Sequence, residues 1–129
     1  MINTSVFDYV NVLDKAADAS WLRQEAISNN IANATTPGYK RQDVAFESEL
    51  KKALGCCTHE SMDAKVGNLK ASDLKPVAYT DNSGLSYRLD GNNVDPENEN
   101  VMLAENQLKY QGLMTCINQE FQNLQAVMK

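Results

Sequence analysis

Three cysteines and one histidine are the side chains of this 129-residue chain best suited to hold a metal or act as nucleophiles. Cys56 and Cys57 are adjacent, His59 follows closely, and Cys116 lies far along the chain. Thiolates and imidazole are good zinc ligands, and a histidine can activate a nearby thiol. Zinc sites usually separate paired cysteines by two to four residues, because adjacent sulfurs converge poorly on one ion. We predict loop thiols, an exposed histidine and a small packed Cys116, and keep a thiol or zinc protein as an alternative.

Acidic side chains form a second cluster near Gly91. Asp90, Asp95, Glu97 and Glu99 carry ligands that calcium prefers, but their spacing is not that of an EF-hand loop. Helix capping and solvation explain them better. The glycines form no phosphate-cradling pattern either. We therefore predict no metal, no cofactor, no small-molecule substrate and no enzymatic activity.

Charge and length limit the classes of partner. Lys and Arg number 12 against 17 Asp and Glu, so the formal charge is -5 and the isoelectric point is near 4.8. This balance is opposite to that of a phosphate-binding surface, and we predict no nucleic-acid partner. The N-terminus lacks a basic region and an apolar core, and no apolar run reaches about 18 residues. We expect neither a cleaved secretory signal nor a membrane-spanning helix.

The first part of the chain has the period of a helix. Apolar residues recur at alternating steps of four and three, which places them along one stripe. Ser20 and Gln24 are polar members of this stripe, and such residues in coiled coils fix register at a cost in stability. The stripe consists of Val6, Val10, Leu13, Ala17, Ser20, Gln24, Ile27 and Ile31.

The last part of the chain repeats this pattern. Asp95 is placed to cap a helix and Pro96 suits its first position, so we predict a helix from Pro96 to near Lys129, about 50 Å long. Asn106 and Glu120 are its polar seam positions. The stripe consists of Leu103, Asn106, Tyr110, Leu113, Ile117, Glu120, Leu124 and Val127.

Both stripes must pack on something, either on each other or on neighbouring copies, and periodicity does not separate these cases. We predict a mainly α fold in which two long terminal helices form an antiparallel coiled-coil-like pair around a small irregular or β-hairpin middle.

The middle begins where the first helix stops. Asn33 can adopt conformations that end a helix, and Pro37-Gly38 suits the centre of a type II turn. Lys40 and Arg41 then return the chain to solvent or to an acidic partner. Beyond them we predict a short helix capped by Asp43 and closed by Gly55, with Phe46, Leu50 and Leu54 on one side. We read 55–75 as a loop, and Val77 and Tyr79 as a strand paired in a hairpin with Leu85, Tyr87 and Leu89.

Two stretches carry a resemblance to a known family. SNNIANATTPGYKRQDVAF, residues 28–46, resembles the N-terminal signature of bacterial flagellar axial proteins, the subunits of rod and hook. Its uninterrupted form is most similar to that of the proximal-rod subunits. DGNNVD at 90–95, with the helix that follows, resembles their C-terminal motif. The motif loop comprises Asn29, Asn30, Ala32, Asn33, Thr36, Pro37, Gly38, Tyr39 and Lys40.

The resemblance implies a structural subunit of the flagellar basal-body rod, a drive shaft that transmits torque. Residues 1–34 and 96–129 would form the inner axial core, with both stripes as assembly interfaces and 35–95 facing outward. Implied partners are its own copies, other rod subunits, the adaptor at the membrane ring and the type III export gate. Export would need no cleaved signal peptide. Another rod or hook subunit, or a cytoplasmic helical-hairpin adaptor or chaperone, remains an alternative.

Overall fold

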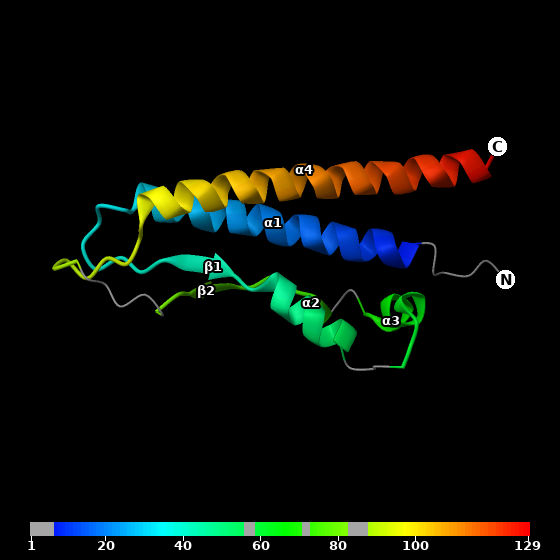
Figure 1. Cartoon of the computed structure of the whole chain (residues 1–129), viewed down its shortest axis with the longest axis horizontal. Helices are drawn as coiled ribbons and strands as arrows, with labels where there is room; N and C mark the ends of the chain where they lie inside the picture. Colours follow the sequence, from blue (N-terminus) through cyan, green and yellow to red (C-terminus); the bar gives the residue numbers. More distant parts are fainter. Residues whose placement is uncertain (1–6, 56–58, 71–72, 83–87) are drawn as a thin grey trace.

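The computed structural model describes residues 7–55, 59–70, 73–82 and 88–129. Two long helices run antiparallel and side by side, and the remaining elements lie against the face of α1 turned away from α4 (Figure 1). The elements are α1 (Asp8–Ala32), β1 (Gln42–Val44), α2 (Phe46–Gly55), α3 (Met62–Asn68), β2 (Ala78–Thr80) and α4 (Pro96–Val127). The predicted fold class is confirmed: a mainly α chain with an antiparallel helix pair and a small β middle.

Helix α4 begins and ends close to where the sequence predicts. The Asp95 carboxylate accepts a hydrogen bond from the Glu97 N–H at 3.1 Å, and Pro96 occupies the first turn, where a missing N–H costs nothing. The helix has 32 residues and ends at Val127. At 1.5 Å per residue it is about 48 Å long.

Helix α1 is the middle layer. The buried hydrophobic cluster lies between α1 and the outer elements, not between the two long helices: Ala19 of α1 meets Val44 of β1, Phe46 of α2 and Leu74. Fully burying a residue such as Phe46 stabilises the fold by about 1.5 to 3 kcal/mol. The outer elements are therefore held to α1 by apolar packing.

The two strands form an antiparallel ribbon whose pairing differs from the predicted hairpin. Gln42 pairs with Thr80 and Val44 with Ala78, so the partner of β2 is β1. Leu85 and Tyr87 lie outside the described residues, and Leu89 sits fully exposed in a turn rather than in a strand. The physical reason is that β1, fixed by Val44 against α1, already offers β2 an edge.

Helices α2 and α3 correct two further predictions. Helix α2 matches the predicted short helix, but Asp43 is not its cap, because Asp43 lies in β1 and pairs with arginines. The segment expected to be a loop contains α3, which Ser61 caps by accepting a hydrogen bond from the Ala64 N–H at 3.3 Å. A helix of seven residues is too short to show a periodic stripe.

The candidate metal ligands do not form a cluster where they are described. His59 and Cys116 are both exposed, so the expectation that Cys116 is packed is wrong. Cys116 directly precedes Ile117 in α4, but only Ile117 is half-buried. Cys56 and Cys57 lie outside the described residues. Within the described ranges, no group of three potential ligands is arranged to hold a metal, and no helix is long and apolar enough to cross a membrane.

Candidate assembly interface

The two predicted stripes form the less exposed sides of the long helices. Ala17, Ser20 and Ile27 are buried, and the other stripe members of α1 are half-buried, except Val6, which lies outside the described residues. On α4 only Asn106 of the stripe is buried. Leu103, Tyr110, Leu113, Ile117, Glu120 and Leu124 are half-buried and Val127 is exposed. The seam is thus well covered at one end of the pair and poorly at the other.

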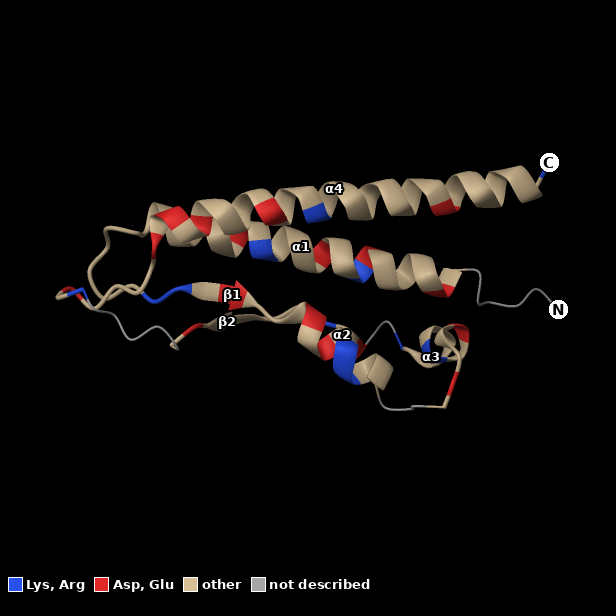
Figure 2. Ribbon diagram, in the orientation of Figure 1, with Lys and Arg blue, Asp and Glu red and all other residues tan. Residues whose placement is uncertain are grey.

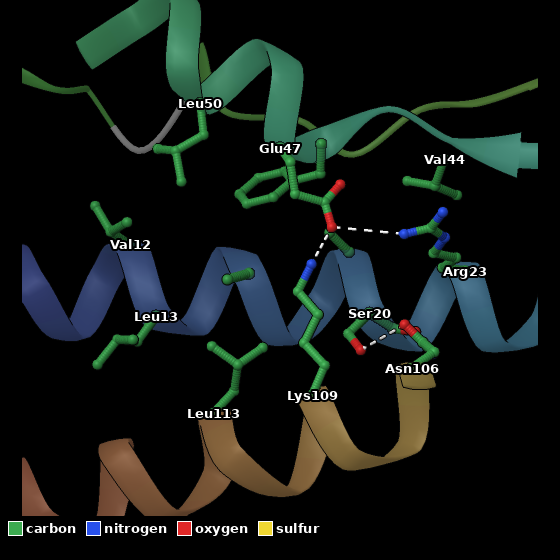
Figure 3. A pocket seen from close by; sticks show the side chains of 13 residues that line it. Val12, Leu13, Ser20, Arg23, Val44, Glu47, Leu50, Asn106, Lys109 and Leu113 are labelled. Atoms are coloured by element: carbon green, nitrogen blue, oxygen red, sulfur yellow. Dashed lines mark hydrogen bonds and ion pairs between the residues drawn. The ribbon is translucent and has the colours of Figure 1, made fainter. Parts of the chain in front are cut away.

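Polar residues of the two stripes meet across the seam. The Ser20 hydroxyl donates to Asn106 Oδ1 at 3.0 Å (Figure 3). Asn106 Nδ2 donates to Ser20 O at 2.9 Å and to Gln24 Oε1 at 3.1 Å. A slip of either helix would leave these buried groups without partners, which costs about 1 to 3 kcal/mol per group. The cluster therefore favours one register, as its position in the heptads predicts.

In this register the end of α4 extends past the described part of α1. Because both helices rise 1.5 Å per residue, the contact of Ser20 with Asn106 sets Asp8, the first residue of α1, opposite Asn118. Helix α4 continues to Val127 and extends past the start of α1 (Figure 1). In the part of the chain that the structure describes, no α4 residue after Asn106 is buried.

The opposite end of the pair is fixed by a buried asparagine from the first motif. Asn30 is fully buried, and its Oδ1 accepts from the Gln42 N–H at 2.9 Å and the Tyr39 hydroxyl at 3.2 Å. Its Nδ2 donates to Gln42 O at 2.8 Å and to Glu99 Oε2 at 3.0 Å. One side chain thereby joins the end of α1, the start of β1 and the first turns of α4.

A second buried asparagine, from the DGNNVD motif, completes the end of α1. Asn92 Nδ2 lies 2.9, 3.0 and 2.9 Å from the carbonyl oxygens of Asn33, Ala34 and Thr36. Carbonyl groups at a helix C-terminus lack intrahelical partners, and this amide supplies one. Asn33 itself has a φ of -102°, so the helix ends without a left-handed residue.

The turns of the two motifs touch. Gly38 has a φ of 71° and the Tyr39 N–H donates to Thr36 O at 3.4 Å, which is the predicted type II turn around Pro37-Gly38. The Gly38 N–H donates to Asp90 O at 2.8 Å, and Lys40 Nζ donates to Gly91 O at 2.6 Å. Gly91 has a φ of 79°, a conformation that L side chains rarely adopt. Two recognisable sequence signatures therefore form one structure.

Arg41 lies at the centre of this structure. Of the two predicted surroundings, solvent or an acidic partner, it has acidic partners, and these belong to the same chain. Its Nε donates to Glu99 Oε1, while Nη1 lies 2.8 Å from Asp81 Oδ2 and Nη2 lies 3.0 Å from Asp43 Oδ2. Glu99, expected at the surface, is only 1% exposed. Periodicity missed this pair because its two members lie on separate motifs that are far apart in the chain.

The charges of this cluster stabilise one another. Burial by itself lowers the pKa of Arg41, but hydrogen bonds to Glu99 and Asp43 outweigh it and hold that pKa above its ordinary value. Burial, followed by the negative charge of Glu99, raises the pKa of Tyr39. The guanidinium and the phenol therefore keep their protons at neutral pH.

We name the set of Asn30, Arg41, Asn92 and Glu99 the polar junction.

A second contact zone lies between α1, α2 and α4. A mainly apolar groove of about 260 Å³ includes Leu13, Leu50 and Leu113 in its lining, and Glu47 pairs across its mouth with Lys109 (Figure 3). Burial raises the pKa of Glu47, but the hydrogen bond from Lys109 outweighs it and lowers that pKa overall.

Elsewhere in the molecule, charged side chains concentrate on the outer elements and on the paired parts of the two long helices, whereas the end of α4 carries few of them (Figure 2).

Comparison with known proteins gives one consistent result. A family model described as "Flagella basal body rod protein" matches residues 11–40. The flagellar basal body rod protein FlgB of Borreliella burgdorferi is 38% identical over 122 residues, 87% of this chain and 89% of the relative. Those of Proteus mirabilis and Bacillus subtilis are 35% and 32% identical, covering 83% and 90% of this chain and 83% and 89% of their own lengths.

Proposed function

Because this chain belongs to the FlgB family of flagellar basal-body rod proteins and is a structural subunit of that rod, we propose that it polymerises through its terminal helices to build the proximal drive shaft. The observation that carries the proposal is the uncovered length of α4. No α4 residue after Asn106 is buried by the described part of the chain, although the apolar stripe continues to Val127. We infer that neighbouring chains cover that surface in the assembled rod.

The proposed interface consists of the two stripes at the end of the pair away from the polar junction. Val10 and Leu13 on α1, and Ile117 and Leu124 on α4, are half-buried within the chain. Completing the burial of such a side chain is worth roughly 1 kcal/mol, about half of the full transfer value. The gain per residue is small, so assembly depends on many subunits contributing together.

We further propose that residues 1–34 and 96–129 form the inner axial core and that 35–95 faces outward. The layered arrangement supports this division, because the buried cluster that holds the outer elements lies on the face of α1 turned away from α4. The pair of Glu47 and Lys109 is a further contact, between α2 and α4. The polar junction ties the two parts together. Torque applied to one part would pass to the other through buried, charge-assisted hydrogen bonds rather than through a loose loop.

Assembly with other rod subunits in the basal body follows from the family. The finer partners are proposals: the adaptor at the membrane ring and the type III export gate, with export that needs no cleaved signal. We also propose a purely structural role without catalysis. The junction end of the helix pair would be ordered in the free chain, and the distal halves would order when neighbours cover them.

Deletion and complementation test this function. Cells lacking the chain should form membrane rings without a rod and should not swim, and a plasmid copy should restore both. Circular dichroism of the purified chain should show less helix than α1 and α4 together would give. Assembled rods in the deletion strain would refute the structural role, and a stable, fully helical monomer would favour a helical-hairpin adaptor.

A further inference from the structure

An exposed aromatic patch lies on α1 and α4. Trp21 is 65% exposed, and its ring centroid is 6.4 Å from that of Tyr110 at a tilted angle. Trp21 is two residues after Ala19, or about 200° around the helix, so the patch faces away from the outer elements. An open groove of about 380 Å³ surrounds it, and the described lining adds only serine, asparagine and glutamine. Exposed aromatic residues of this kind are typical centres of protein interfaces.

A second unmatched surface is the end of α4 that extends past α1. Three of its apolar side chains are exposed: Phe121 is 47% exposed, Val127 86% and Met128 85%. The segment 121–128 contains no charged side chain. Its composition, apolar residues interleaved with glutamine and asparagine, matches that of the patch.

Charge favours a contact between these two surfaces. The chain has a net charge of -5, so two copies repel, and juxtaposed like charges are costly at an interface. Glu25 is exposed about one turn after Trp21 and disfavours an acidic occupant, whereas Asp18, about one turn before Trp21, is paired with Lys15. The end of α4 is neutral and is followed by Lys129, a complementary cation. The groove beside α2 is a poorer docking site for the end of α4, because docking there would desolvate the ion pair of Glu47 and Lys109.

We propose that residues 121–128 of one copy dock on the aromatic patch of Trp21 and Tyr110 of a second copy. This inference rests on the proposed function and specifies one contact within it. The two surfaces differ, so the contact is heterologous and repeats without closing on itself unless a ring forms. Two helical turns bury far less than the ~1,000 Å² of a stable complex, so the isolated chain should remain monomeric.

Photo-crosslinking in assembled rods tests the contact. With p-benzoylphenylalanine at position 121, mass spectrometry of isolated basal bodies should find crosslinks to 18–25 or 107–111. The register sets Trp21 opposite Glu105, about 24 Å along α4 from position 121, so a crosslink to 18–25 must join two copies. The reciprocal label at position 21 should reach 121–128. The same reagent at Met62, exposed on α3, is the matched control and should not reach 18–25.

Crosslinks from position 121 only to other segments, or only to other proteins, would overturn the contact while leaving the chain in the rod. Absence of the wild-type chain from basal bodies would instead refute the proposed function. A charge exchange gives an independent test: Glu25→Lys and Lys129→Glu should each lower incorporation about threefold, and the double variant should restore it. Normal incorporation of both single variants would also count against the contact.

Discussion

Replacing Glu99 by alanine should destabilise the free chain more than any other single acidic substitution on α4. Glu99 is 1% exposed and accepts from Arg41 Nε and from Asn30 Nδ2, which lies 3.0 Å away. Breaking a buried ion pair from one side costs about 3 to 5 kcal/mol. Arg41 keeps Asp43 and Asp81 as partners, so we expect the lower end, about 3 kcal/mol.

Urea unfolding followed by circular dichroism measures this loss. Small proteins lose about 1 to 3 kcal/mol of stability per molar urea, so the midpoint should fall by about 1.5 M. Glu105→Ala, an exposed site on the same helix, is the matched control and should change stability by less than about 0.5 kcal/mol. Equal midpoints for the two variants would refute the argument that the polar junction holds the helix pair to the outer elements.

Three further outcomes are expected. Replacing Gln24 and Asn106 together by leucine should raise helicity but disturb rod assembly, because apolar seams gain stability and lose register; unchanged motility and rod length would contradict this. Asn92→Ala should lower the free energy of unfolding by about 1 kcal/mol in urea titrations, because three carbonyl groups after α1 lose the Asn92 amide, although Asn33 O keeps the Thr36 N–H and Ala34 O keeps the Arg88 guanidinium. The pKa of Glu47 is held below its ordinary value of 4.5, so its stabilising contribution is complete above that pH and is lost as the pH falls through the lower folded-state value. The Lys109→Met variant should therefore lose less stability than the wild type between pH 6 and pH 3, and equal losses would contradict the pairing.

The long helices could be predicted from sequence because their signals are local. Asp95 and Pro96 mark the start of α4 through the groups they cap or omit, and the steps of three and four define its buried side. The type II turn at Pro37-Gly38 is equally local, since it depends on the φ each residue allows. The heptad steps mark Ser20 and Asn106 as polar seam positions, but their hydrogen bond depends on the register of two separate helices.

The polar junction could not be predicted, because it consists of pairings between residues far apart in the chain. Glu99 reads as a first-turn acid that complements the helix dipole, and only the folded chain shows that Arg41 reaches it. Asp43 likewise reads as a helix cap until β1 fixes it beside Arg23 and Arg41. The strand pairing was misplaced for the same reason, since turn residues indicate a hairpin only when no other strand edge is available.

The central claim is that the terminal helices form the inner core of the rod and that their stripes are completed by neighbouring subunits. A density map of isolated basal bodies, resolved well enough to trace side chains, tests it most directly. We predict that α1 and α4 lie in the inner layer of the proximal rod, that 35–95 faces outward, and that Ile117, Leu124 and Val127 are buried against other chains. Rods in which these residues remain exposed, or in which the chain is missing, would contradict the account.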